Sequence, residues 1–175
     1  LPGDVAAREL SLVPGQDVKA LLKEVATGDD IVLKNGVWND ADLKFELPPG
    51  TAEKPIVIRA ETPGQVVFTG ATEFRLSGQY VTVSGFVFRD CSGASDVVQL
   101  RTHSERHAHH CRMTDCVFEE AADADAKIES RWLSIYGTNN RLDHCYIAGK
   151  KNRGPSAVVW VGDESQHHRI DHKHF

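Results

Sequence analysis

The first periodic apolar segment of the chain is DVKALLKEVAT at residues 17–27. Its apolar residues follow the i, i+3, i+4, i+7 spacing of one helix face: Val18, Leu21, Leu22 and Val25. Asp17 stands at the start of the segment and Gly28 directly after its end, as helix capping favours. The pattern therefore predicts a short amphipathic helix over 17–27.

After this segment the apolar residues come in short runs rich in β-branched and aromatic side chains, and Gly, Ser, Asn or Asp separates them. The runs are 31–33, 55–59, 66–69, 80–83, 86–88, 97–100, 132–135 and 157–161. Runs of this kind predict β-strands. Both a sandwich of two sheets and a solenoid contain strands of this length.

An eight-residue pattern that occurs four times decides between these two folds. Its order is an inward-facing residue, any residue, an inward-facing residue, two polar or small residues, an inward-facing residue, any residue, and an inward-facing residue. The copies are VTVSGFVF at 81–88, CRMTDCVF at 111–118, NRLDHCYI at 140–147 and HRIDHKHF at 168–175. Equivalent positions lie 30, 29 and 28 residues apart. A period of this size is typical of a solenoid.

The repeat predicts a parallel β-helix. One coil is too short to bury its own apolar side chains, so each coil stacks on the next with strands about 4.8 Å apart. Equivalent side chains then form ladders inside the tube. The second ladder holds Val83, Met113, Leu142 and Ile170, the third Phe86, Cys116, Cys145 and Lys173, and the fourth Phe88, Phe118, Ile147 and Phe175.

The remaining segments complete this prediction. The two polar or small residues in each copy mark a bend between strands, and the runs at 97–100, 132–135 and 157–161 form a further strand set between the copies. A solenoid also has to cover its open ends, because bare strand edges recruit other chains. The helix over 17–27 suits that role at the N-terminal end.

Composition narrows the possible partners and the location. With 175 residues the chain fits one domain, and a formal net charge of −5 argues against an overall nucleic-acid-binding surface. No apolar run approaches the length of a membrane span. The chain starts at Leu1, which is consistent with a mature protein whose signal peptide was removed or with an arbitrary start.

The four cysteines form no CxxC pair, so they predict no zinc site. Cys116 and Cys145 occupy the same ladder one coil apart, a spacing that a disulfide allows. A stack of buried free thiols is the alternative that we favour, since cysteine packs well as a small apolar residue.

Several stretches resemble polysaccharide lyase family 6, which contains alginate lyases and chondroitinase B. They are DIVLKNGVWND at 30–40, EKPIVIRAETPGQVVFTG at 53–70, SGQYVTVSGFVFRDC at 77–91, RWLSIYGTNNRLDHCYIAGKKNRGP at 131–155 and HHRIDHKHF at 167–175. The resemblance implies a right-handed parallel β-helix with an N-terminal helix cap. The first two stretches look more like the alginate-lyase branch.

The resemblance also implies a reaction, the β-elimination of alginate. In that family a calcium ion held by Asn and Glu neutralises the uronate carboxylate, a lysine removes the C5 proton and an arginine protonates the leaving O4. No motif in residues 1–175 matches these groups, so we expect the catalytic and calcium-binding residues beyond residue 175. The chain then is the N-terminal portion of one β-helix domain, with coils over 30–175, and is inactive without the C-terminal remainder.

Five residues are candidates for contact with an anionic polysaccharide. Lys150, Lys151 and Arg153 place three cations in one turn, where loops on a rigid scaffold commonly bind ligands. Tyr136 follows a predicted strand, and the resemblance suggests that an aromatic residue near it touches substrate. His172 lies in the last copy of the repeat. For each, a solvated turn or ordinary packing is the alternative.

Two further features carry alternatives. His103, His107, His109 and His110 suggest a metal site, but no carboxylate or cysteine completes it, so we expect a histidine-rich surface turn. Lys173 occupies an inward position, which is costly unless the lysine is paired or reaches solvent.

The alternatives to an alginate lyase are a non-catalytic glycan-binding β-helix, a lyase of the same family that cleaves chondroitin or dermatan sulfate, and a pectate-lyase-like enzyme. By the resemblance we expect a bacterial protein that is secreted or periplasmic.

Overall fold

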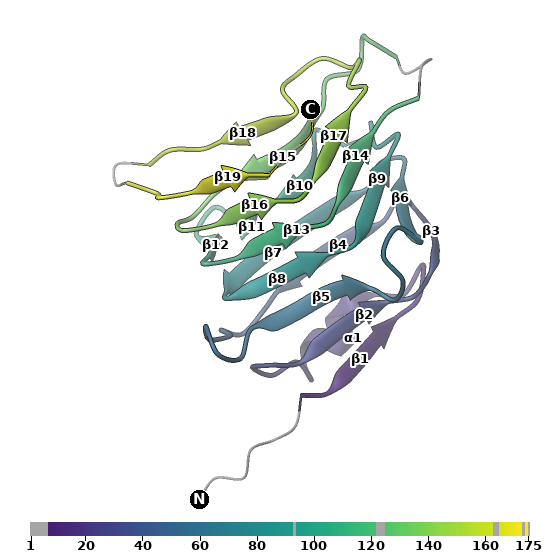
Figure 1. Cartoon of the computed structure of the whole chain (residues 1–175). Helices are drawn as coiled ribbons and strands as arrows, with labels where there is room; N and C mark the ends of the chain where they lie inside the picture. Colours follow the sequence, from purple (N-terminus) through teal and green to yellow (C-terminus); the bar gives the residue numbers. More distant parts are fainter. Residues whose placement is uncertain (1–6, 93, 122–124, 163–164, 173, 175) are drawn as a thin grey trace, which may run out of the picture.

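A computed structural model of the chain describes residues 7–92, 94–121, 125–162, 165–172 and 174. Short strands wind into a tube with one strand of each coil in each of three sheets (Figure 1). The parallel β-helix that the repeat predicts is thereby confirmed. Sheet 1 contains β1 (Glu9–Leu12), β2 (Asp30–Leu33), β5 (Ile56–Ala60), β8 (Val81–Ser84), β13 (Arg112–Thr114), β16 (Arg141–Asp143) and β19 (Arg169–Asp171).

The other two sheets follow the same order of stacking. Sheet 2 contains β3 (Gly36–Asn39), β6 (Val66–Thr69), β9 (Phe86–Arg89), β14 (Val117–Glu119) and β17 (Tyr146–Ala148). Sheet 3 contains β4 (Asp42–Glu46), β7 (Glu73–Gln79), β10 (Asp96–Gln99), β15 (Arg131–Ile135) and β18 (Ala157–Val159), together with β11 (Arg101–His103) and β12 (Arg106–His109). The pairs between coils are parallel, whereas β11 and β12 form an antiparallel hairpin.

The predicted ladders have the predicted register. Met113 pairs with Val83 on one side and with Leu142 on the other, and Leu142 pairs with Ile170. The fourth ladder pairs Phe88 with Phe118 in the same way. Of the third ladder, Phe86, Cys116 and Cys145 are buried, and all four cysteines are free thiols. Lys173 and Phe175 lie outside the described residues.

Stacked aromatic rings fill the tube. The rings of Phe68 and Phe88 are 5.0 Å apart between centroids, and those of Phe88 and Phe118 are 4.8 Å apart and nearly parallel. Trp38 precedes Phe68 in the same ladder through the pairing of β3 with β6. Since all four side chains are at most 2% exposed, this column of rings fixes the radius of the coils on which the surface groups stand.

The predicted polar bends lie between sheet 1 and sheet 2. Each has one residue in the left-handed region of backbone conformation, with φ between 49° and 83°: Gly85, Asp115, His144 and His172. Three of these four are Asp or His, which adopt this conformation more readily than most side chains. The bend is therefore repeated from coil to coil without a glycine in each.

The N-terminal end differs from the prediction in two respects. The helix α1 is Val18–Leu22, shorter than the predicted 17–27, with Asp17 accepting a hydrogen bond from the Lys19 amide as its N-cap. Beyond it the chain turns, and the amide of Ala26 donates to Asp29 instead of continuing the helix. A strand, β1, precedes the helix and had no counterpart among the predicted strands. As expected, α1 lies at the N-terminal end of the tube (Figure 1).

Among the described residues, no helix has the length and apolar character needed to cross a membrane.

Candidate functional site

The outer face of sheet 3 carries two rows of side chains that cross the coils. The first row is fixed by strand pairing: Lys44, Arg75, Gln99, Ser134 and Val158 are successive partners. Because side chains alternate along a strand, the residues two positions further on face the same side. They form a second row, which contains Arg101, Tyr136 and Trp160.

Tyr136 lies at the centre of a stack in this second row. Its ring is parallel to that of Trp160, with 5.7 Å between centroids and 7° between planes. On the neighbouring coil the guanidinium carbon of Arg101 lies 4.0 Å from the centre of the Tyr136 ring. Tyr136 is 8% exposed, and Trp160, which directly follows the last described strand of sheet 3, is 43% exposed. Burial, together with the nearby charge of Asp96, raises the pKa of Tyr136, which keeps the phenol neutral.

A buried carboxylate underlies the stack. Asp96, in β10, accepts two hydrogen bonds of 2.7 Å from Arg131 and a short one from the hydroxyl of Ser134, both in β15. Burial alone would raise the pKa of Asp96, but these bonds and the charge of Arg131 outweigh it and lower the pKa. Arg131 in turn lies over the Trp160 ring, 5.8 Å from its centre. The ionised pair therefore holds the two strands that carry the stack.

The chain directly after Tyr136 is tightly held. The side-chain amide of Asn140 donates to the carbonyl oxygens of Tyr136 at 2.7 Å and of Ala108 at 2.9 Å, and its oxygen accepts from the Cys111 amide at 2.9 Å. Gly137 has a φ of +79°, and a Cβ at this position would lie 1.9 Å from the Ala108 oxygen. The backbone of the second row is thus fixed against the hairpin.

The hairpin β11–β12 contains three of the four clustered histidines, His103, His107 and His109, and borders the stack. The His107 ring lies 5.7 Å from that of Tyr136, and His109 Nδ1 lies 2.9 Å from the Thr138 hydroxyl. His103 Nε2 lies 2.6 Å from the Lys44 ammonium nitrogen. The cluster is therefore a pair of strands and not the turn that the sequence predicted. No set of three or more His, Cys, Asp or Glu side chains within the described ranges could hold a metal ion.

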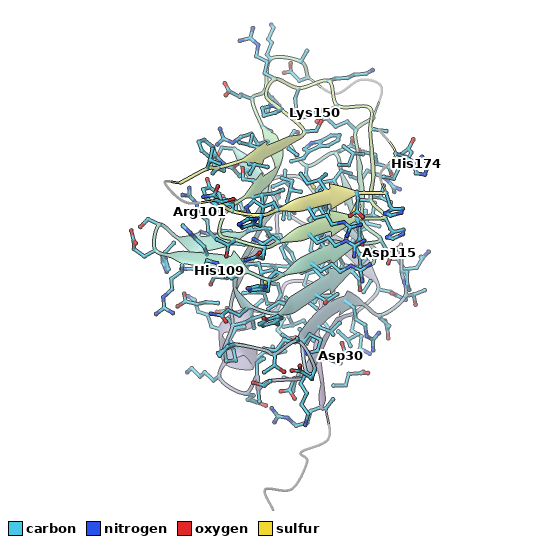
Figure 2. All side chains as sticks on the ribbon, turned by 60° about the vertical axis from the view of Figure 1, so that its left-hand side comes forward. Asp30, Arg101, His109, Asp115, Lys150 and His174 are labelled. Atoms are coloured by element: carbon cyan, nitrogen blue, oxygen red, sulfur yellow. The ribbon has the colours of Figure 1, made fainter. Side chains whose placement is uncertain are left out.

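The five candidates from the sequence fall at three separate places. Tyr136 lies in the stack described above. Figure 2 shows Arg101 and His109 on one side of the tube, Asp115 and His174 on the other, and Lys150 at the end. The site residues predicted from sequence are therefore not one cluster.

The turn with Lys150 lies between β17 and β18. The Lys150 ammonium donates to the carbonyl oxygens of Asn152 at 3.1 Å and Arg153 at 3.2 Å, and it lies 5.5 Å from the centre of the Trp132 ring. Burial lowers the pKa of Lys150. This side chain is directed into its own turn, whereas Lys151 and Arg153 are exposed.

His172 occupies a bend on the side of the tube away from Arg101. Its ring stacks on that of His144, with 5.0 Å between centroids and 9° between planes, and its Nδ1 lies 3.0 Å from Asp171. Nothing in this position brings it near Tyr136.

Four members of the site were missing from the sequence prediction: Arg101, Trp160, Asp96 and Arg131. A signal for Trp160 was present, because Ile135 and Val159 are partners in register and each is followed by an aromatic residue. Arg101 carried no such signal, since it follows the end of β10 in a segment without obvious periodicity. The arrangement as a whole can bind a ring-shaped anionic ligand, because aromatic faces pack on apolar ring surfaces and guanidinium groups pair with carboxylates.

A comparison with protein families shows which family the chain is related to. The family model for chondroitinase B matches residues 14–175, nearly the whole chain. The chain belongs to the chondroitinase B family, polysaccharide lyase family 6. A comparison with curated proteins finds no match.

Solved structures of this lyase family agree with the fold. The alginate lyase AlyGC is 36% identical, with a TM-score of 0.85, over 94% of this chain. A mannuronic acid specific family 6 lyase from human gut microbiota is 31% identical, with a TM-score of 0.81, again over 94%. The lyase Pedsa3628 from Pseudopedobacter saltans, at 20% identity and a TM-score of 0.74, shares the fold. The chain spans 23% of the length of AlyGC and 40% of that of the gut enzyme.

The calcium ion that this lyase family implies has no site among the described residues. Calcium takes six to eight oxygen ligands, mostly carboxylates and carbonyls. The acidic side chains of the candidate site do not converge: both oxygens of Asp96 accept hydrogen bonds from Arg131 and Ser134. The described part of the chain therefore does not fit the ion.

Proposed function

We propose that the chain is the N-terminal part of an alginate lyase that cleaves by calcium-assisted β-elimination, and that it supplies the scaffold and part of the substrate-binding face. The observation that carries the proposal is the likeness over 94% of the chain to two family 6 lyases more than 30% identical, an alginate lyase and a mannuronic acid specific enzyme. The stack on sheet 3 supports it, since a polyuronate is a chain of rings with carboxylates.

The proposal assigns binding and orientation to this part of the protein. Trp160 offers aromatic surface to a sugar ring and the buried Tyr136 supports it from the neighbouring coil, while Asp96 and Arg131 hold the strands that carry them. The proton-abstracting lysine, the arginine that protonates O4 and the calcium ligands belong, in this proposal, to coils after residue 175. Binding energy from such remote contacts accelerates a reaction when it fixes the reacting group in position.

A second candidate is a lyase for chondroitin or dermatan sulfate, and the match to the chondroitinase B model favours it. These polymers alternate a uronate with a sulfated amino sugar, so they also present carboxylates and rings to an aromatic and cationic face. The third candidate is a glycan-binding β-helix without catalytic groups. The first two candidates differ in substrate, and the third differs from both in having no turnover.

The test uses the complete protein that contains this chain and the chain of 175 residues by itself. Each is incubated with alginate, dermatan sulfate and chondroitin sulfate, with calcium or with a chelator, and absorbance of the unsaturated product is followed. We expect calcium-dependent cleavage of alginate by the complete protein and none by the chain alone. Cleavage of the sulfated polymers alone supports the second candidate, and no cleavage of any polymer supports the third.

We further propose that the protein is secreted or periplasmic, because a polysaccharide has to be shortened before it can enter a cell. Cell fractionation of the source organism with an antibody against the chain tests this, and recovery in the cytoplasm would contradict it.

A further inference from the structure

The cations around the outer face of sheet 3 differ in what balances their charge. Three arginines there have a carboxylate within 4 Å: Arg75 beside Asp42, Arg106 beside Glu46 and Arg131 beside Asp96. A guanidinium already paired to a carboxylate has less to gain from a second anion. These three are therefore poor candidates for recognition of an anionic ligand.

Arg101 is different. Its Nε donates a long hydrogen bond of 3.4 Å to Gln99, and within the described ranges no Asp or Glu side chain lies at ion-pair distance from it. Its guanidinium carbon lies 4.0 Å from the centre of the Tyr136 ring. A ring contacts the flat face of a guanidinium, whereas the N–H donors point outward in its plane. The stack thus orients Arg101 and leaves its terminal donors available.

The described neighbours of Arg101 interact with its charge but form no ion pair with it. Burial raises the pKa of Tyr136, so the phenol is neutral at physiological pH. The charge of Arg101 helps to lower the pKa of Asp96, but the two oxygens of Asp96 accept their hydrogen bonds from Arg131 and Ser134. Within the described ranges the site therefore contains one partly buried cation with no carboxylate at ion-pair distance, beside two aromatic rings.

We infer that Arg101 determines specificity by pairing with the carboxylate of a uronate residue whose ring lies beside Tyr136 and Trp160. The inference rests on the proposed function, and it names the group of the substrate that this part of the face recognises. A bidentate pair of this kind distinguishes a uronate from the neutral sugar of the same shape, because the neutral sugar leaves the cation unpaired.

The test measures binding apart from cleavage, in the complete protein. Native electrophoresis in the cold, through gels that contain either alginate or carboxyl-reduced alginate, gives the affinity for each polymer. Arg101→Gln is expected to weaken alginate binding by about tenfold to a hundredfold, the range for loss of a hydrogen bond to a charged group. Binding of the carboxyl-reduced polymer is expected to stay unchanged, and Arg101→Lys is expected to fall between wild type and Arg101→Gln.

The matched control is Arg89→Gln, which removes the same charge from an exposed arginine on sheet 2. It is expected to leave both affinities unchanged, and circular dichroism checks that every variant is folded. Equal binding of alginate by wild type and Arg101→Gln would overturn the inference and leave the proposed lyase intact. Alginate binding that depends on Arg101 without any unsaturated product would support the inference and contradict the lyase, and no alginate binding by the wild type would contradict both.

Discussion

Asp96 is the residue on which the stability of the binding face depends most. Its side chain is 8% exposed and receives three hydrogen bonds, two from Arg131 at 2.7 Å and one from Ser134. Asp96→Asn keeps the size and one acceptor oxygen but removes the charge and one of the two bonds to Arg131. The Arg131 side chain is 28% exposed, so solvent compensates part of the loss.

The expected cost is about 2–3 kcal/mol in the free energy of unfolding, at or just below the roughly 3–5 kcal/mol for breaking a buried ion pair, because Arg131 is partly solvated. Urea unfolding followed by tryptophan fluorescence measures it, with Trp160 beside Arg131 as a local reporter. The control is Asp42→Asn, which breaks an arginine pair on the same sheet whose carboxylate is 73% exposed. Solvent-exposed pairs contribute about 0–1 kcal/mol. Equal losses for Asp96→Asn and Asp42→Asn would show that burial of the Asp96 pair adds nothing to its stability.

The pH dependence gives a second readout of the same variant. The pKa of Asp96 is lower in the folded protein than its ordinary value of 3.8. The ionised Asp96 therefore contributes its full stabilisation when the pH is above its pKa in the unfolded chain. This stabilisation is lost as the pH falls toward its pKa in the folded protein. We expect the stability advantage of wild type over Asp96→Asn to shrink on acidification below about pH 4. An advantage that grows in acid would contradict this assignment.

The other predictions concern the backbone and the thiols. Gly137→Ala is expected to lower the free energy of unfolding by about 3 kcal/mol or more, because its Cβ would overlap the Ala108 oxygen. Gly15→Ala, at a glycine with positive φ but open space around it, is expected to lower it by about 1–2 kcal/mol. Thermal unfolding compares the two variants, and similar losses would contradict the close contact at Gly137. Burial raises the pKa of Cys91 to about 12 and that of Cys111 to about 11. Iodoacetamide is therefore expected to leave the folded protein unmodified at pH 8. After unfolding without reductant, it is expected to alkylate four thiols per chain. Recovery of two thiols would instead indicate a disulfide between Cys116 and Cys145.

The sequence predicted the solenoid because its ladders repeat a local pattern. Apolar residues at fixed intervals of 28–30 residues can meet each other only if the coils stack, and the register of Met113 on Val83 follows directly. The ends of the helix were not predictable in the same way. The segment after Leu22 keeps the apolar spacing of a helix, yet its Ala26 amide bonds to the side chain of Asp29 three residues further on, a local polar contact that apolar periodicity does not encode.

The binding face was predictable in part. Tyr136 follows a strongly apolar strand and was identified, but its partners come from other coils: Arg101 from the preceding one and Trp160 from the following one. Which side chains meet across coils depends on the register of each strand, and the loops between strands vary in length. The hairpin β11–β12 illustrates the limit, since its histidines alternate as strand residues do but its polar composition is typical of a turn.

A crystal structure of the complete protein with a bound oligomer of mannuronate or guluronate would show directly where the substrate lies. We expect the oligomer to cross the outer face of sheet 3, with one sugar ring beside Tyr136 and Trp160 and its carboxylate within hydrogen-bonding distance of Arg101. An oligomer bound on the outer face of sheet 1 or sheet 2, with no contact to these three residues, would contradict this expectation.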